Sequence, residues 1–442
     1  MKITFPLIRI AFIVLISTQI NAQVKAPQLT LQEQQIVVDS ISSKLTANYI
    51  FPDVAEKMAS SIKSKLQKGD YKSILDPDQF ANTLTADLRA ISKDKHIWLS
   101  FGPEHITKQL NATAKDSSAH LNWQISNMKR NNFGFKEVKI LDGNVGYLDL
   151  RSFYNVEHAG KTAVSAMNFL SNSDAIIIDL RSNYGGHPTM IQLITSYLYG
   201  SKPVHLNNFY WRPTDSNSQT WTLPHVSGTR SPDTPVYILT SSHTFSAGEE
   251  FCYNLKNLKR ATLIGETTGG GAHPGREFIA TNRYMIWIPT GRAINPITNT
   301  NWEGTGVSPH IETPAKDAFN DAYLKALETL MNNNKEAGSK AFYEWAIAKL
   351  KVKTNPINLD SKTLKSFVGS YGARKITIKD GTLFYQADNE TKYELYPYSD
   401  HEFMLKGLKG FRIRFLYEGK KVTSLQGLYG GGGMDISIKE NK

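Results

Sequence analysis

The chain has 442 residues, of which 40% are hydrophobic and 21% charged, a balance that is ordinary for a globular protein and excludes a disordered or collagen-like chain. The net charge of +11 is mild for this length and no nucleic-acid-binding motif accompanies it, so no nucleic-acid partner is expected. The single cysteine, Cys252, excludes an intrachain disulfide and a cysteine-rich metal site.

The first residues have the layout of a secretory signal. Lys2 and Arg9 flank a short apolar run at residues 10–16, and the small residue Ala22 follows a polar stretch. We therefore expect a signal peptide over residues 1–22, cleaved after Ala22, and a periplasmic or secreted protein. The apolar run is far shorter than the ~20 residues that span a bilayer, and no later stretch is long enough, so no integral membrane segment is expected after cleavage.

Residues 30–92 show helical periodicity, because apolar side chains recur there at three- and four-residue spacing. The pattern predicts three helices inside an N-terminal helical domain over residues 28–135. The three apolar stripes are Leu31, Val37, Ile41 and Leu45; Val54, Met58, Ile62 and Leu66; and Phe80, Leu84, Leu88 and Ile91.

From about residue 137 short β-branched runs alternate with helix-sized segments, as in a parallel or mixed sheet covered by helices. This predicts an α/β catalytic domain over residues 136–335, in which a stretch from 203 to 234 is irregular. The predicted strands are at 145–148, 175–178, 236–239 and 261–264, and the predicted helices between them are at 157–170, 188–199 and 246–258.

The tail changes pattern again. Two further helices are expected near 315–331 and 340–351, after which alternating residues flank the turn signal Asp380-Gly381. Evenly spaced strands up to residue 428 predict a small antiparallel β domain over residues 356–442.

Ser246 is the first candidate for chemistry. It lies where the strand at 236–239 gives way to the helix at 246–258, beside free helix N–H groups that can stabilise an oxyanion. Serine is also a favoured helix N-cap, and this position alone does not separate the two roles.

Two glycine-rich segments also follow buried strands. Residues 179–186, D-L-R-S-N-Y-G-G, end in Gly185 and Gly186, whose backbone can approach a ligand closely or form a tight turn. Residues 265–271, G-E-T-T-G-G-G, lack the lysine of a phosphate-binding P-loop, which argues against nucleotide binding.

Together with T-F-S-A-G-E at 244–249, these motifs resemble the serine peptidase superfamily of C-terminal processing peptidases, the tricorn protease core and interphotoreceptor retinoid-binding protein. The resemblance covers residues 30–315 and implies a mixed α/β catalytic domain with a crotonase-like core. It implies Ser246 as nucleophile, with oxyanion donors from the Gly185/Gly186 backbone and from the N–H of Ala247. It also implies a peptide or protein substrate, with no cofactor and no metal.

The branches of the superfamily differ in the residue that serves as the catalytic base. The superfamily is of the tail-specific protease type. Its processing peptidases use a lysine near position 271, but no lysine lies between Lys259 and Lys316 here. The tricorn-like branch uses a histidine from the preceding domain and a late glutamate, and the matching segments here, 94–97 and 302–309, carry His96 and Glu303. The interval from His96 to the strand at 145 is too short for a PDZ domain. Where the tricorn-like site has a serine beside its histidine, this chain has Lys95.

Other functions stay open at this point. His187, His243 and His273 lie on the same loops, so a metal hydrolase is conceivable, although no H-E-x-x-H motif is present. An α/β-hydrolase is a weak rival because its site residues occur in a different order. A non-catalytic protein that binds peptides or apolar ligands on the same scaffold is the main alternative to an exported serine peptidase.

Overall fold

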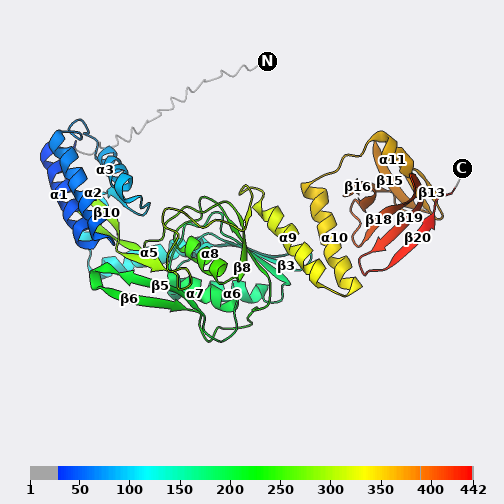
Figure 1. The fold of residues 1–442 in the computed structure, drawn as a ribbon, viewed down its shortest axis with the longest axis horizontal. Helices are drawn as coiled ribbons and strands as arrows, with labels where there is room; N and C mark the ends of the chain where they lie inside the picture. Colours follow the sequence, from blue (N-terminus) through cyan, green and yellow to red (C-terminus); the bar gives the residue numbers. More distant parts are fainter. Residues whose placement is uncertain (1–27, 389, 441–442) are drawn as a thin grey trace, which may run out of the picture.

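The computed structural model describes residues 28–388 and 390–440, so the predicted signal peptide and its cleavage after Ala22 lie outside the described residues. The described chain is elongated, with an N-terminal group of helices at one end, a helix-covered sheet in the middle and an antiparallel sheet at the other end (Figure 1). Among the described residues we find no helix long and apolar enough to cross a bilayer.

The three predicted N-terminal helices are confirmed as α1 (Leu31–Asn48), α2 (Pro52–Lys68) and α3 (Pro77–Ser92). Apart from Leu31, which is exposed, their apolar stripes form or pack against one buried cluster, and side chains of Thr30 and Asp76 cap α1 and α3. This region is not purely helical, however. Strand β1 (Trp98–Phe101) pairs antiparallel with β10 (Tyr284–Pro289), which also pairs with β9 (Gly275–Ile279). The N-terminal helices therefore share a core with strands that come from much later in the chain.

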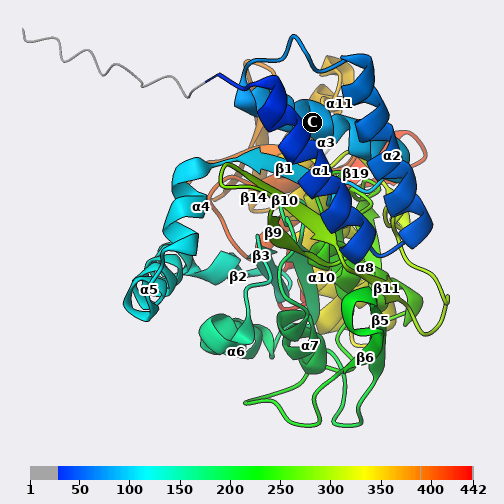
Figure 2. The same ribbon diagram turned by 90° about the vertical axis from the view of Figure 1, so that its left-hand side faces the viewer.

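Two more helices, α4 (Pro103–Leu110) and α5 (Ala114–Arg130), were not predicted. They project away from the body of the protein, as Figure 2 shows. Of α4 only Ile106 is buried, and the large apolar side chains Leu121 and Trp123 of α5 are exposed, so neither helix adds much to the core.

The described residues form a six-stranded central sheet in the order β12-β8-β7-β4-β3-β2, parallel except for the edge strand β2. The four predicted strands and three predicted helices are confirmed within it. The strands are β2 (Phe135–Leu141), β3 (Val145–Leu150), β4 (Ala175–Asp179), β7 (Val236–Thr240), β8 (Ala261–Gly265) and β12 (Ile311–Glu312).

Helices cover both faces of this sheet, which explains why its parallel strands are continuous apolar runs. One face packs on α6 (Val156–Leu170), α7 (Pro188–Tyr197) and α8 (Ala247–Asn257). The other packs on α9 (Ala318–Asn333), and α10 (Ala337–Thr354) packs on α9.

The stretch 203–234, expected to be irregular, contains a β-hairpin, and that expectation is wrong in part. Strands β5 (His205–Trp211) and β6 (Ser216–Trp221) pair with each other, and β5 also pairs with β11 (Gly291–Ile294). Most side chains of β6 are exposed, and its Ser, Asn and Gln residues do not show the alternation of apolar and polar residues by which strands are recognised.

The tail is an antiparallel sheet, as the two-residue period predicted. Helix α11 (Ser361–Phe367), which was not predicted, precedes the sheet. Phe367, Phe403 and Phe415 are fully buried at its centre, and a bridge between Tyr371 and Lys439 brings its two ends together. The strands of the described tail are β13 (Gly369–Tyr371), β14 (Arg374–Lys379), β15 (Thr382–Ala387), β16 (Tyr393–Pro397), β17 (Glu402–Leu405), β18 (Phe411–Glu418), β19 (Lys421–Tyr429) and β20 (Met434–Ile438).

Candidate active site

Ser246 lies at the turn from β7 into α8, at the carboxyl ends of the parallel strands, where α/β sheets bind their ligands. Its φ of 53° and ψ of −120° are strained for a residue with a side chain. The turn is fixed on both sides, because Phe245 N–H donates to the Asn183 carbonyl at 3.0 Å and Ser246 N–H donates to Glu249 Oε2 at 2.9 Å. The surrounding structure thus holds Ser246 in a conformation that the residue alone would not adopt.

Gly185 and Gly186 lie against this turn. A Cβ on Gly185 would be 2.8 Å from the Ser246 Cβ, and the φ of 105° at Gly185 also favours glycine. Gly185 N–H donates to Asn183 Oδ1 at 2.8 Å. Gly186 N–H and Ala247 N–H have no acceptor among the hydrogen bonds of the described residues. Of the three groups expected to bind an oxyanion, two therefore have an unpartnered N–H.

Glu249, in the first turn of α8, is completely buried and organises the loop beside Ser246. Its carboxylate accepts hydrogen bonds from Thr268 Oγ1 at 2.5 Å, Gly270 N–H at 2.6 Å and Gly271 N–H at 2.8 Å, besides that from Ser246. Burial raises the pKa of Glu249 above its ordinary value, although these hydrogen bonds oppose the shift. Its four hydrogen bonds thus fix the loop at residues 268–271 beside Ser246.

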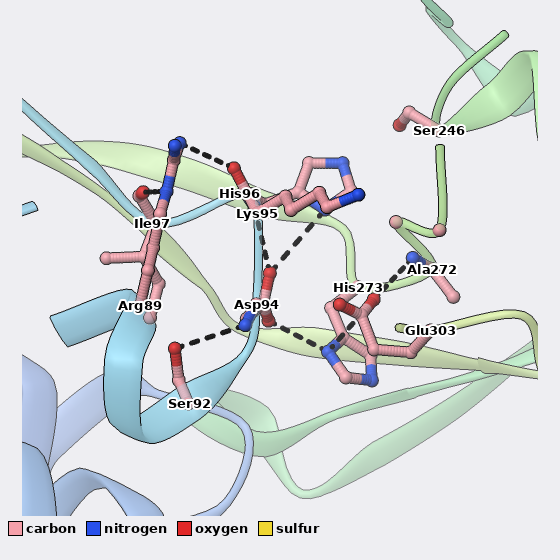
Figure 3. Close-up of polar contacts among 12 residues, drawn as sticks. Arg89, Ser92, Asp94, Lys95, His96, Ile97, Ser246, Ala272, His273 and Glu303 are labelled. Carbon is pink, nitrogen blue, oxygen red and sulfur yellow. Dashed lines mark hydrogen bonds and ion pairs between the residues drawn. The ribbon is translucent and has the colours of Figure 1, made fainter. Parts of the chain in front are cut away.

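His96 comes to the site from the loop between α3 and β1. Its ring packs on the ring of Phe245, the residue before Ser246, with 4.6 Å between the centroids. Figure 3 shows the Ser246 side chain beyond His96, and no hydrogen bond joins the two in the described structure. Both ring nitrogens of His96 are buried without a hydrogen-bond partner.

Gly271 lies against the same two rings. A Cβ at this position would contact the Phe245 ring and would be 2.6 Å from His96 Cε1. The space into which a side chain from residue 271 would project is therefore filled by His96 and Phe245.

Asp94, Glu303 and His273 surround His96 on the side away from Ser246 (Figure 3). Asp94 Oδ1 accepts His96 N–H at 2.9 Å, and His273 Nδ1 lies 2.8 Å from Asp94 Oδ2 and 3.4 Å from Glu303 Oε2. Glu303 Oε2 also accepts Ala272 N–H at 2.5 Å, whereas its Oε1 is buried without a partner.

These two carboxyl groups shift in opposite directions. Burial alone would raise the pKa of Asp94, but the hydrogen bonds and charges of His273 and His96 hold it well below its ordinary value. Burial, together with the negative charge of Asp94, raises the pKa of Glu303. Of the two carboxyl groups, Asp94 therefore loses its proton more readily.

Lys95 replaces the serine of the tricorn-like pattern. Its side chain is exposed, and its Nζ donates to the Gly269 carbonyl at 2.6 Å. The residue thus ties the N-terminal region to the loop that Glu249 holds.

The structure does not gather the three histidines considered for a metal. His187 accepts Thr189 N–H at 3.3 Å as the cap of α7, and His243 is exposed. Another group, Asp94, His96 and Glu303, offers ligand atoms within 4.8 Å of one another. Such nitrogen and oxygen donors suit zinc, but at that spacing they would have to move closer together to bind one ion.

Three site residues escaped the sequence reasoning: Asp94, His273 and Asn183. Asp94 and Asn183 lie inside the matched motifs, so the motifs were a signal for them. The sequence suggests His273 as a metal ligand but not as a partner of Asp94, because nothing in the spacing indicates that the two residues lie side by side.

A strained serine at a strand-to-helix turn, with unpartnered N–H groups beside it, is the arrangement of a serine hydrolase. Residues 144–313 match the model of the family described as peptidase family S41. Residues 28–130 match that of the N-terminal domain of Peptidase_S41 in eukaryotic IRBP. The chain therefore belongs to peptidase family S41 and is a serine-type peptidase. Only residues 131–143 separate the two matches, which leaves no room there for a PDZ domain.

Solved structures of similar fold include a lipoprotein from Streptococcus agalactiae, at 13% identity over 67% of this chain and 96% of the other, with a TM-score of 0.45. A putative peptidase from Parabacteroides merdae is 16% identical over 64% of this chain and 90% of its own, with a TM-score of 0.43. The photosystem II D1 C-terminal processing protease is 14% identical over 65% and 94%, with a TM-score of 0.41.

Proposed function

We propose that this peptidase cleaves peptide bonds with Ser246 as the nucleophile, His96 as the general base and Glu303 as a charge that stabilises protonated His96. The observation that carries the proposal is the pairing of Ser246 with the unpartnered N–H groups of Gly186 and Ala247. Hydrogen-bond donors that lie near a nucleophile and have no acceptor of their own can stabilise an oxyanion.

In this mechanism Ser246 Oγ attacks the carbonyl carbon of the substrate while His96 takes the hydroxyl proton. Gly186 and Ala247 donate to the resulting oxyanion, and Gly185 contributes by having no Cβ in the way. His96 then returns the proton to the leaving amine. The hydrogen bond between His96 and Ser246 would form when substrate is bound, since such bonds are often long in a free enzyme.

The filled space at Gly271 supports histidine over lysine as the base. A lysine at residue 271 would need the volume that His96 and Phe245 occupy, so the two arrangements exclude each other. The chain has His96 in that place, which favours the tricorn-like catalytic site.

Glu303 is proposed to stabilise the positive charge that His96 acquires during the reaction. A carboxylate oxygen of Glu303 lies within 4.8 Å of a ring nitrogen of His96, and Glu303 Oε1 has no hydrogen-bond partner. A buried negative charge at that distance favours the protonated imidazole.

Export is the second part of the proposal. It rests on the charged start, the short apolar run and the small residue at Ala22. The substrates would then be peptides or proteins outside the cytoplasm. N-terminal sequencing of the protein from its native cells tests this, because export predicts a chain that begins at Gln23.

The test of the catalytic residues is covalent labelling with a fluorophosphonate, followed by mass mapping of the adduct. We expect a single adduct at Ser246, which Ser246→Ala abolishes. Ser242→Ala is the matched control, since Ser242 is an exposed serine of the same turn and should leave labelling intact. A wild-type protein that is never labelled would favour a non-catalytic binding protein.

A further inference from the structure

We propose that His273 is a positioning residue, which fixes the carboxylate of Asp94 and through it the base His96. The inference rests on the proposed function, because it concerns how the base of that site is held. It begins from the burial of His273, whose side chain is 5% exposed and whose ring is not part of the proton path.

His273 is held by the N-terminal region although it belongs to the loop between β8 and β9. Its Nδ1 lies 2.8 Å from Asp94 Oδ2, and its ring meets the edge of the Phe51 ring with 5.3 Å between centroids. Asp94 Oδ2 is also the acceptor for Tyr49 OH, so the carboxylate accepts here too and Nδ1 of His273 carries the hydrogen. Glu303 Oε2, at 3.4 Å from the same nitrogen, favours the same tautomer.

The two oxygens of Asp94 divide their contacts. Oδ2 accepts from His273 and, at 3.3 Å, from Tyr49 OH. Oδ1 faces His96, where it accepts the main-chain N–H at 2.9 Å and lies 3.7 Å from ring Nδ1. A carboxylate held at one oxygen cannot turn about its Cβ–Cγ bond, so the bond from His273 keeps Oδ1 directed at His96.

This contact also joins separate parts of the chain. Asp94 and His96 follow α3, whereas His273 precedes β9 and Glu303 lies beyond β11. The position of the base relative to Ser246 therefore depends on the contact between His273 and Asp94. Loss of its donor is expected to misplace the base by a fraction of an ångström to an ångström, and such a displacement can cost about 10²-fold in rate.

The experiment compares two amides at residue 273. The side-chain nitrogen of His273→Asn can occupy the place of Nδ1, whereas that of His273→Gln reaches the place of Nε2. We expect kcat on one chromogenic peptide to stay within about 5-fold of wild type in His273→Asn and to fall about 10²-fold in His273→Gln, with KM changed little in both. Equal losses in the two variants, or a loss that falls on KM, would overturn the proposal.

A double variant tests whether His273 acts through Asp94. Adding His273→Gln to Asp94→Ala should lower kcat by less than about 2-fold, because the partner is already absent. A further loss as large as in the single variant would contradict the proposal even if His273→Gln proved less stable, which thermal unfolding would report. Ser246→Ala measured alongside separates the two levels of inference. If Ser246→Ala were active, the proposed function would fail, whereas equal effects of Asn and Gln with an inactive Ser246→Ala would remove only the role of His273.

Discussion

The two halves of the proposed site are built in different ways. Ser246 and the N–H groups of Gly186 and Ala247 lie in the loops that follow the neighbouring strands β7 and β4 and in the first turn of α8, all within the region that follows residue 144. His96 lies on a loop from the N-terminal region, where its ring packs on Phe245 and its neighbour Asp94 contacts His273. The first half is fixed by a buried sheet, and the second by contacts between regions distant in sequence.

The difference indicates what each half can tolerate. Main-chain groups at the ends of parallel strands keep their places as long as the sheet is folded. A base carried on a separate region is exposed to any change that alters how that region docks. Variants of the nucleophile half should therefore act on chemistry alone, whereas variants of the base half should also depend on the contact between regions.

The largest effect is expected where the nucleophile itself is lost. Ser246→Ala should lower kcat/KM by at least ~10³-fold while changing the free energy of unfolding by about 1 kcal/mol or less, since at most a helix cap is removed. Peptide hydrolysis and thermal unfolding measure the two quantities. Equal activity in Ser246→Ala and wild type would refute the assignment, and Ser242→Ala should behave as wild type.

Loss of the base tests the other half. His96→Ala should cost about as much as Ser246→Ala, and the double variant should be little worse than either, because members of one catalytic unit are not additive. Kinetics of the three proteins on one chromogenic peptide measure this. The exposed His105 on α4 supplies the control His105→Ala. Near-normal activity of His96→Ala would show that the base lies elsewhere.

A backbone change probes the rigid half at smaller scale. The Cβ added by Gly185→Ala would lie 2.8 Å from the Ser246 Cβ at a φ that disfavours alanine. We expect kcat to fall about 10²-fold, through displacement of Ser246 and its oxyanion donors. Gly200→Ala is the matched control, because a Cβ there meets nothing within 4 Å. Similar kcat values for the two variants would mean that the close packing at Gly185 is not needed.

The buried carboxyl group of Glu250, in α8, is expected to make the free energy of unfolding depend on pH. Burial raises the pKa of Glu250 to about 7 from 4.5, although a hydrogen bond from Asn207 opposes the shift. A raised pKa means that protonated Glu250 stabilises the fold below pH 4.5 and that this stability is lost as pH rises through 7. Glu250→Gln should therefore stabilise the protein above pH 7, by at most about 3 kcal/mol, and much less at pH 4.5. Urea unfolding at both pH values, with the exposed Glu56→Gln as control, measures this, and a pH-independent difference would contradict it.

The smallest effect is expected from removing the tail. We propose that the β domain at 356–442 folds by itself and is not needed for bond cleavage, since α10 ends before it and packs on α9, the helix that covers the central sheet. A chain ending after Thr354 should keep kcat/KM on a small peptide within about 3-fold. An inactive but well-folded truncated protein would show instead that the tail completes the site.

The sequence predicts the sheet and the nucleophile better than it predicts the base. The parallel strands were predictable because both of their faces are buried, and Ser246 because its turn joins such a strand to an amphipathic helix. The β5–β6 hairpin was missed because its exposed side chains are polar and show no alternation.

The base half was predictable only through a resemblance. Nothing in the spacing of His96, Glu303 and His273 places them together, because β1 joins β10 by a pairing between residues almost 200 positions apart. Motif matching assigned His96 and Glu303, but it gave no role to His273, whose partner Asp94 becomes visible only in three dimensions.

The central claim is that a base from the N-terminal region activates Ser246, and the rate of fluorophosphonate labelling tests it most directly. The second-order rate constant for labelling should fall at least about 10²-fold in His96→Ala, while the residual adduct still maps to Ser246. An unchanged labelling rate in His96→Ala, or an adduct at a different residue, would contradict the account.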